Sequence, residues 1–349
     1  MNKDKLLTII LGLGLALIPI HRCGNVFWAI GFALVLIAVA GIIVLRIREH
    51  KLSLGPKCVY IPLAIIVLSM LMSDCTWEVR LLGVSLLTIY VASVNLKHEL
   101  KLLVPAVVIG CASIVVCNVV AGVRTGGMYS PNNYNIAVGA IVVGSLLCKI
   151  KHQWILVSVV LIGLAFSGAE EALVALTFLG ITLIIRRDWS RRLLLSAGVL
   201  VLVVLACAPS GVLGQLWHTN RVEAASQNNW EAVWEGRLEA WKNAVTDIKP
   251  FGYGYTPFYV RYSSIHSVPL RILYETGPLA SLAWLFVVGY VMVKTKRKYI
   301  PTAIIALSLF DHMLWTQLSV YTFTAIGIAM RDDDVGDLIF KEKGEVVKI

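Results

Sequence analysis

Apolar runs of roughly twenty residues recur along almost the whole of this 349-residue chain. A helix needs about 20 apolar residues to cross the hydrocarbon core of a bilayer, so each run is long enough to do so. Only 15% of the residues are charged, whereas soluble domains carry about 25% charged residues. The runs lack the apolar and polar alternation of a transmembrane barrel. The sequence therefore predicts an all-α, polytopic membrane protein.

The runs predict about twelve transmembrane helices. They begin near Leu6, Val26, Cys58, Val79, Leu102, Tyr134, Trp154, Glu171, Leu193, Val268, Ile300 and Thr316. No small-x-small cleavage site follows the first run, so we expect an uncleaved span rather than a removed signal peptide. The chain then divides into nine spans within 1–208, a polar loop over 209–267, three spans within 268–330 and a tail over 331–349.

Basic residues are unevenly distributed between alternate loops. Of the 31 lysines and arginines, 22 fall in one alternating set of loops and termini and 9 in the other. Cytoplasmic loops are enriched in Lys and Arg, so both termini are predicted to be cytoplasmic and the 209–267 loop external. The net charge of +10 is spread over short loops. This favours a topology signal over an interface for nucleic acid.

The long external loop holds most of the candidate functional residues. Trp230, Trp234, Arg237 and Trp241 are spaced 4, 3 and 4 residues apart, which puts them on one face of a helix predicted over 230–248. An amphipathic helix at the bilayer surface accounts for the tryptophans. Arg237 in the same stripe either reaches a lipid phosphate or binds an anionic ligand through its planar, permanently charged guanidinium.

Two further patterns lie near the C-terminal end of this loop. Gly252 and Gly254 flank a tyrosine and permit a tight turn and close backbone approach, although alone they indicate no more than a turn. Ser267 is a candidate N-cap, and Pro269 suits the first turn of the next helix. His266 is therefore expected at the outer mouth of a span, as a residue without a role, a phosphate ligand or a general base.

Charges are rare inside the predicted spans. Arg271 and Glu275 are four residues apart, just inside the span that begins at Val268. Isolated charges at that depth are costly, so we expect these two side chains to form an ion pair.

A second external loop, 124–134, is rich in glycine and carries Arg124 and two asparagines beside Pro131. An ordinary turn capped by asparagine explains this composition. The functional interpretation is a loop that folds back towards the external site.

These residues carry a resemblance to a known family. Arg124-x-x-Gly127 followed by Ser130-Pro131-Asn132 resembles the R-x-x-G…N-P-N element of the O-antigen ligase and polysaccharide polymerase superfamily. Arg237-x-x-x-Trp241, Pro250-x-Gly252-x-Gly254, His266 and Gly277 resemble its R-x-x-x-W, P-x-G-x-G, H-N and glycine signature. The chain departs from the family at Ser267, where asparagine is usual, and at Glu170 and Glu171, where a cation is common.

The resemblance implies a fold and an activity. Members have about a dozen spans in the bacterial inner membrane, one long periplasmic loop before the last few spans, and cytoplasmic ends. They transfer a glycan from undecaprenyl pyrophosphate to an acceptor hydroxyl, with inversion expected and without nucleotide sugar, metal or other cofactor. The chain agrees with this in having no external Asp-x-Asp and no His/Cys cluster with metal spacing.

The resemblance also suggests residue roles. Arg237 and Arg124 would meet the charge of the leaving pyrophosphate, and His266 would be the general base or a further phosphate ligand. The expected substrate contacts are Asn132, Tyr253, Tyr255 and Trp241 for the glycan, Arg22, Arg80 and Arg261 for phosphate, and Glu170 and Glu171 for sugar hydroxyls or for holding the arginines.

Alternatives within and beyond the family stay open. A ligase that uses a lipid A-core acceptor, a polymerase that extends a growing glycan, and an oligosaccharyltransferase that modifies protein share the donor and differ in the acceptor. The single long loop before the last three spans favours the ligase. A transporter or flippase of lipid-linked sugars would need charged or broken helices at mid-membrane, and the span centres are nearly free of charge. A non-catalytic membrane scaffold would leave Arg124, Arg237 and His266 dispensable.

Overall fold

The regular structure of the described residues is entirely helical. The computed structural model describes residues 2–20, 25–121, 158–160, 162–163, 166, 227–229, 237–254, 267–297, 299–310 and 317–331. The helices are α1 (Lys3–Leu17), α2 (Asn25–Arg48), α3 (Lys57–Met72), α4 (Trp77–Val94), α5 (Leu103–Ala121), α13 (Arg237–Thr246), α15 (Val268–Thr276), α16 (Pro278–Lys294), α17 (Tyr299–Phe310) and α18 (Gln317–Ala329). This confirms the all-α class over these ranges.

Three of the described helices are long and apolar enough to cross a membrane. They span Val26–Arg48, Trp77–Val94 and Leu103–Val120, and three shorter apolar helices span Lys57–Met72, Pro278–Lys294 and Ser319–Ala329. The chain is therefore a membrane protein by its helix lengths and composition. Of the four spans expected to begin between Tyr134 and Leu193, the structure describes only residues 158–160, 162–163 and 166 of the one near Trp154.

The outer faces of these helices are apolar. On α16, Leu282 and Phe286 are exposed while Ala283 and Val287 are buried. Hydrocarbon tails solvate the exposed side chains, so burial of apolar surface does not drive these helices together. Close packing of small residues contributes instead. A Cβ atom on Gly14 of α1 would lie 2.7 Å from the carbonyl oxygen of Gly31 in α2, so the two backbones are in direct contact there.

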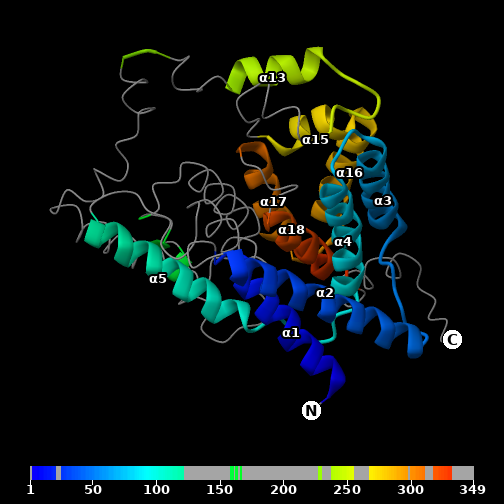
Figure 1. The fold of residues 1–349 in the computed structure, drawn as a ribbon, viewed down its shortest axis with the longest axis vertical. Helices are drawn as coiled ribbons and strands as arrows, with labels where there is room; N and C mark the ends of the chain where they lie inside the picture. Colours follow the sequence, from blue (N-terminus) through cyan, green and yellow to red (C-terminus); the bar gives the residue numbers. More distant parts are fainter. Residues whose placement is uncertain are drawn as a thin grey trace, which may run out of the picture.

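Long-range pairing of helices sets their order. α1 packs on α2, α3 on α16, and α4 on α18. The hydroxyl of Tyr321 in α18 donates a hydrogen bond to the Leu15 carbonyl of α1. Figure 1 shows α13 above α15, on the side of α15 away from α16, with the N-terminus at the opposite end. These two ends are called the α13 end and the N-terminal end below.

The span expected to begin at Val268 is interrupted. Its first part, α15, has 9 residues, and α16 begins only after Gly277. Gly277 has φ 93° and ψ 172°, a conformation that is essentially restricted to glycine. The sequence prediction treats α15 and α16 as one span, although α15 is the more polar of the two and includes Arg271 and Glu275. Arg271 and Glu275 therefore lie in a short separate helix above α16.

Candidate functional site

The candidate site is at the α13 end. It is built from α13, residues 247–254, α15 and the loop 73–76 between α3 and α4, and α13 packs on α15 (Figure 1). Three of these segments lie within residues 237–276, and the loop 73–76 is distant from them in sequence. Both side-chain packing and backbone contacts join them.

Residues 252–254 pair with the last turn of α15. The Tyr253 amide donates to the Tyr274 carbonyl at 2.8 Å, and the Gly254 amide donates to the Glu275 carbonyl at 3.0 Å. Gly252 has φ 68°, and a Cβ atom on it would overlap the Glu275 backbone. The last carbonyls of a helix lack partners within it. Residues 252–254 supply donors to two of them, so this segment caps the C-terminal end of α15.

Gly277 completes this contact from the other side. Its amide donates to the Ile272 and Leu273 carbonyls at 3.1 Å each, and a Cβ atom on it would overlap the Pro250 carbonyl oxygen. The glycine junction is the name used here for Pro250, Gly252 and Gly254 packed against 275–277. Its tight approach explains why these positions are glycine, and it is more than the isolated turn expected from sequence.

The glycine junction also reaches the loop between α3 and α4. Gly254 has φ 81°, and a Cβ atom on it would overlap the Asp74 carbonyl oxygen. Arg80, in the first turns of α4, donates through its guanidinium to the Ser73 carbonyl at 3.1 Å. Arg80, expected as a phosphate contact, is therefore at the α13 end and holds the loop that Gly254 touches.

Tyr253 connects α13 to α15 through its side chain. Its ring stacks on Tyr274 with centroids 4.8 Å apart and an interplanar angle of 16°. Lys249 places its Nζ atom 3.8 Å from the Tyr253 ring centroid, and the Tyr253 hydroxyl donates to the Asp247 carboxylate. Tyr253 is thus a well-held packing residue, and its contact with a sugar stays a prediction.

Helix α13 is the described part of the helix expected over 230–248, and it ends two residues before the expected position. It runs from Arg237 to Thr246, and residues 230–236 lie outside the described residues. Ala240 and Ala244 are buried with Tyr274, and the half-buried Trp241 packs against them. Leu238 and Val245 are 51% and 52% exposed.

The buried stripe of α13 is therefore made of small residues. Alanines allow α13 to lie close to α15, while Leu238 and Val245, which neighbour Trp241 at three and four residues' distance along the helix, are exposed. Arg237 is the first residue of α13 and precedes Ala240 and Trp241 by one helical turn.

The start of α15 agrees with the sequence expectation. Ser267 occupies the N-cap position with extended backbone, although its side chain makes no capping hydrogen bond, and Pro269 lies in the first turn. The Arg271 Nε atom is 2.9 Å from Glu275 Oε1, and both side chains are at most 3% exposed. The predicted ion pair is confirmed. It lies within α15, one helical turn along from Ser267.

The remaining expected site residues lie outside the described residues. They are Arg22, Arg124, Asn132, Glu170, Glu171, Tyr255, Arg261 and His266. Trp241, Tyr253 and Arg80 are brought to the α13 end, and the backbone of Arg237 joins them there.

Sequence reasoning missed Asp74, Asp247, Lys249 and Tyr274, which surround the glycine junction. The signal for them was the Pro250-x-Gly252-x-Gly254 motif, because paired glycines often mark close backbone approach.

The chemistry available in the described part of this site is that of cations and aromatic rings. Over the described ranges, no group of three His, Cys, Asp or Glu side chains is placed to hold a metal ion. Neither protein-family models nor curated proteins match this chain.

Proposed function

We propose that this protein is a membrane glycosyltransferase of the O-antigen ligase type. It transfers a glycan from undecaprenyl pyrophosphate to an acceptor hydroxyl at the external face of the bacterial inner membrane. The α13 end is the site of transfer. The product belongs to a cell-surface polysaccharide such as lipopolysaccharide.

One observation carries this proposal. The residues that resemble the family's P-x-G-x-G element and its later glycine are distant in sequence, yet Pro250 and Gly277 are in backbone contact and Gly252 and Gly254 complete the same junction. A chance match of short motifs gives no reason for these positions to meet. The junction supports a shared architecture in which α13, beginning at Arg237, is held over the start of α15.

The proposed reaction is a displacement at the anomeric carbon. The acceptor oxygen bonds to that carbon while the bond from the carbon to the pyrophosphate oxygen breaks, which inverts the configuration. His266 takes the acceptor proton, or binds phosphate if another group is the base. The lipid pyrophosphate leaves as an anion, and Arg237 and Arg124 stabilise its charge through bidentate hydrogen bonds.

The proposed topology has about twelve spans and both termini in the cytoplasm. It is supported by the basic residues of the described loops. Arg46 donates hydrogen bonds to the Asp4 carboxylate and the Asn95 carbonyl. Arg331 and Lys97 line one cavity. These basic segments therefore share the N-terminal end, opposite the glycine junction (Figure 1). By the positive-inside rule the N-terminal end is cytoplasmic and the α13 end is periplasmic.

The glycan profile of a deletion strain tests the function. A ligase predicts that full-length polymer is still made and stays on the lipid carrier, while attachment to lipid A-core is lost. Short products of one repeat unit would indicate the polymerase instead, and loss of glycan from protein alone would indicate an oligosaccharyltransferase. An unchanged profile of every surface glycan would reject the proposal.

A further inference from the structure

A basic cavity lies at the N-terminal end, remote from the proposed transfer site. It has a volume of about 230 Å³ and is lined by Arg46, Lys51, Ser53, Asn95, Lys97 and Arg331, together with two apolar residues. Four of these side chains are cationic. The proposed transfer reaction assigns this cavity no role.

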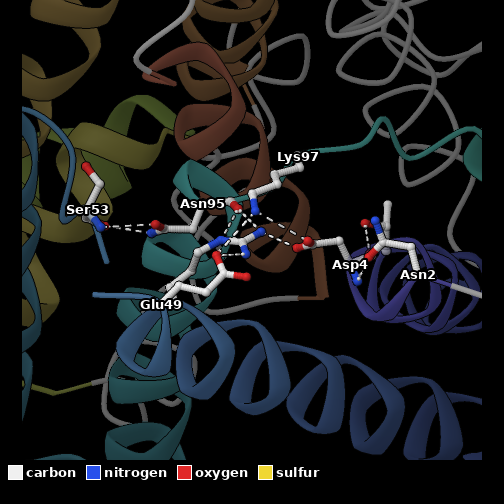
Figure 2. A network of polar contacts seen from close by, with 8 residues as sticks. Asn2, Asp4, Glu49, Ser53, Asn95 and Lys97 are labelled. Carbon is white, nitrogen blue, oxygen red and sulfur yellow. Dashed lines mark hydrogen bonds and ion pairs between the residues drawn. The ribbon is translucent and has the colours of Figure 1, made fainter. Parts of the chain in front are cut away.

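The wall of the cavity is a fixed polar network. Arg46 is 3% exposed and donates to the Asp4 and Glu49 carboxylates and to the Asn95 carbonyl, the last through Nε at 3.2 Å. The Asn95 side chain accepts from the Ser53 amide at 3.0 Å and donates to the Ser53 carbonyl. Figure 2 shows these contacts joining segments from α1, α2, the loop after α2 and the end of α4. The cavity is thus held open by groups that are already hydrogen bonded.

Positive charge exceeds negative charge around the cavity. Lys97 Nζ lies 3.4 Å from Asp4 and 3.2 Å from Glu49. The described lining contains four cationic side chains and no carboxylate, and Asp4 and Glu49, outside the lining, form ion pairs with Arg46 and Lys97. Lys51 is exposed, and its ammonium makes no ion pair within the described residues. An anion is the ligand that this charge favours.

The position of the cavity points to a membrane lipid. It lies where α2, α4 and α18 end, which is the level of the headgroups for helices that cross the bilayer. Leu52 and Leu54 alternate with the lining residues Lys51 and Ser53 in the same loop and are 37% and 45% exposed. Exposed leucines beside a cationic cavity suit an amphiphile, because acyl chains cover the leucines while the headgroup enters the cavity. Basic pockets between helices on the cytoplasmic side bind anionic headgroups in other membrane proteins.

We propose that the cavity formed by Arg46, Lys51, Ser53, Asn95, Lys97 and Arg331 binds the phosphate of an anionic phospholipid. Lys51 and Lys97 contact the phosphate from the open side, and the buried Arg46 supplies a fixed positive charge behind it. The ligand is a resident lipid of the leaflet at the N-terminal end and is distinct from the lipid-linked glycan.

Lipid-dependent stabilisation of the purified full-length protein tests this site. Phosphatidylglycerol is titrated into phosphatidylcholine mixed micelles, and the mole fraction giving the half-maximal rise in unfolding temperature is measured. A ligand that binds only the folded state raises this temperature. Each cation near a headgroup contributes about 1 kcal/mol, a factor of about five in affinity. Lys51→Ala should therefore raise the half-maximal mole fraction about fivefold, and Lys51→Ala with Lys97→Ala about 25-fold.

The matched control is Lys57→Ala, which removes an exposed cation from the same end outside the cavity. It should respond to phosphatidylglycerol like the unchanged protein, as should Lys51→Arg. Equal weakening by Lys57→Ala would show that surface charge alone attracts the lipid and would overturn the proposal. So would a double variant with an unchanged response. Inorganic phosphate in phosphatidylcholine micelles should give no stabilisation, and a full shift with phosphate alone would replace the lipid by a soluble phosphate.

Discussion

Gly277 and Pro250 are in backbone contact, so that a Cβ atom on Gly277 would overlap the Pro250 carbonyl oxygen. This single contact joins the break between α15 and α16 to the segment that follows α13. Both the conformation of Gly277, with φ 93° and ψ 172°, and the distance of approach exclude a larger residue. The position of α13 over α15 therefore depends on a residue with no side chain.

Replacing Gly277 by alanine should misplace α13. The strained conformation alone costs about 1–3 kcal/mol, and the overlap with Pro250 adds to it. We expect a lower unfolding temperature in detergent and a loss of glycan transfer. The matched control is Gly289→Ala in α16, where an added Cβ atom would have no neighbour within 4 Å. Equal stability and transfer for the two variants would show that the glycine junction has no role in holding the site.

Hydropathy predicted the helices well because it depends only on local composition. The runs expected near Val26, Val79 and Leu102 correspond to α2, α4 and α5, which begin at Asn25, Trp77 and Leu103. The same reasoning failed at Gly277. The break there falls at Gly277-Pro278, a local signal that hydropathy does not use. Gly277 also contacts the backbone of Pro250, a residue 27 positions earlier, and local composition cannot predict that contact.

The candidate site was predictable only in part for the same reason. The spacing of Arg271 and Glu275 specified a contact within one helix, and the pair is present. Arg80 could be chosen from its charge, but its hydrogen bond to the Ser73 carbonyl depends on how the loop folds. Asp247 and Lys249 contact Tyr253 through a turn, and nothing in their spacing distinguishes them from solvated loop charges.

The buried pair in α15 gives a second prediction. Removing one partner with Glu275→Ala leaves Arg271 as a buried charge, which costs about 3–5 kcal/mol. Replacing both by apolar residues, Arg271→Met with Glu275→Leu, should recover most of that stability because no charge remains to be desolvated. Unfolding temperatures of the single and double variants measure the difference. Glu239→Ala, at an exposed position of α13, is the control for loss of a carboxylate. A single variant as stable as this control would mean that the pair contributes nothing to α15.

Glu49 gives a prediction on pH. Its hydrogen bond from Lys97, with the nearby Arg46 charge, lowers the pKa of the Glu49 carboxyl below the ordinary value of 4.5. A lowered folded-state pKa stabilises the fold above pH 4.5, and this contribution is lost as the pH falls through the folded value. Glu49→Gln should therefore lower the unfolding temperature at pH 7 and converge with the unchanged protein in acid. Because Glu49 is solvent-accessible, the effect should be small and should shrink in high salt. A gap between the two proteins that widens in acid would contradict the assigned sign.

Cysteine labelling tests the orientation of the two ends. Gln227 is exposed and belongs to the loop proposed to be external, whereas the exposed Cys58 begins α3 at the N-terminal end. In a cysteine-free background, Gln227→Cys should react with an impermeant maleimide in intact spheroplasts. A protein that keeps Cys58 alone should react only after lysis. The reverse pattern would invert the topology and remove the site from the face where the donor is displayed.

The last prediction concerns the charge on the leaving group. If Arg237 and Arg124 stabilise the departing pyrophosphate, alanine at either position should lower turnover by about 10²–10³, the cost of losing one donor to a developing charge. Arg237→Lys should restore only part of the rate, because an ammonium keeps the charge but loses the bidentate fork.

His266→Ala should be as severe if His266 is the base, and milder if it only binds phosphate. The control is Lys242→Ala, which removes an exposed cation from the same helix as Arg237 and should leave the rate unchanged. Each variant is compared at equal amounts of inserted protein. An Arg237→Ala protein that transfers glycan at the rate of Lys242→Ala would reduce Arg237 to a contact with lipid phosphate. The proposed stabilisation of the leaving group would then have no support from α13.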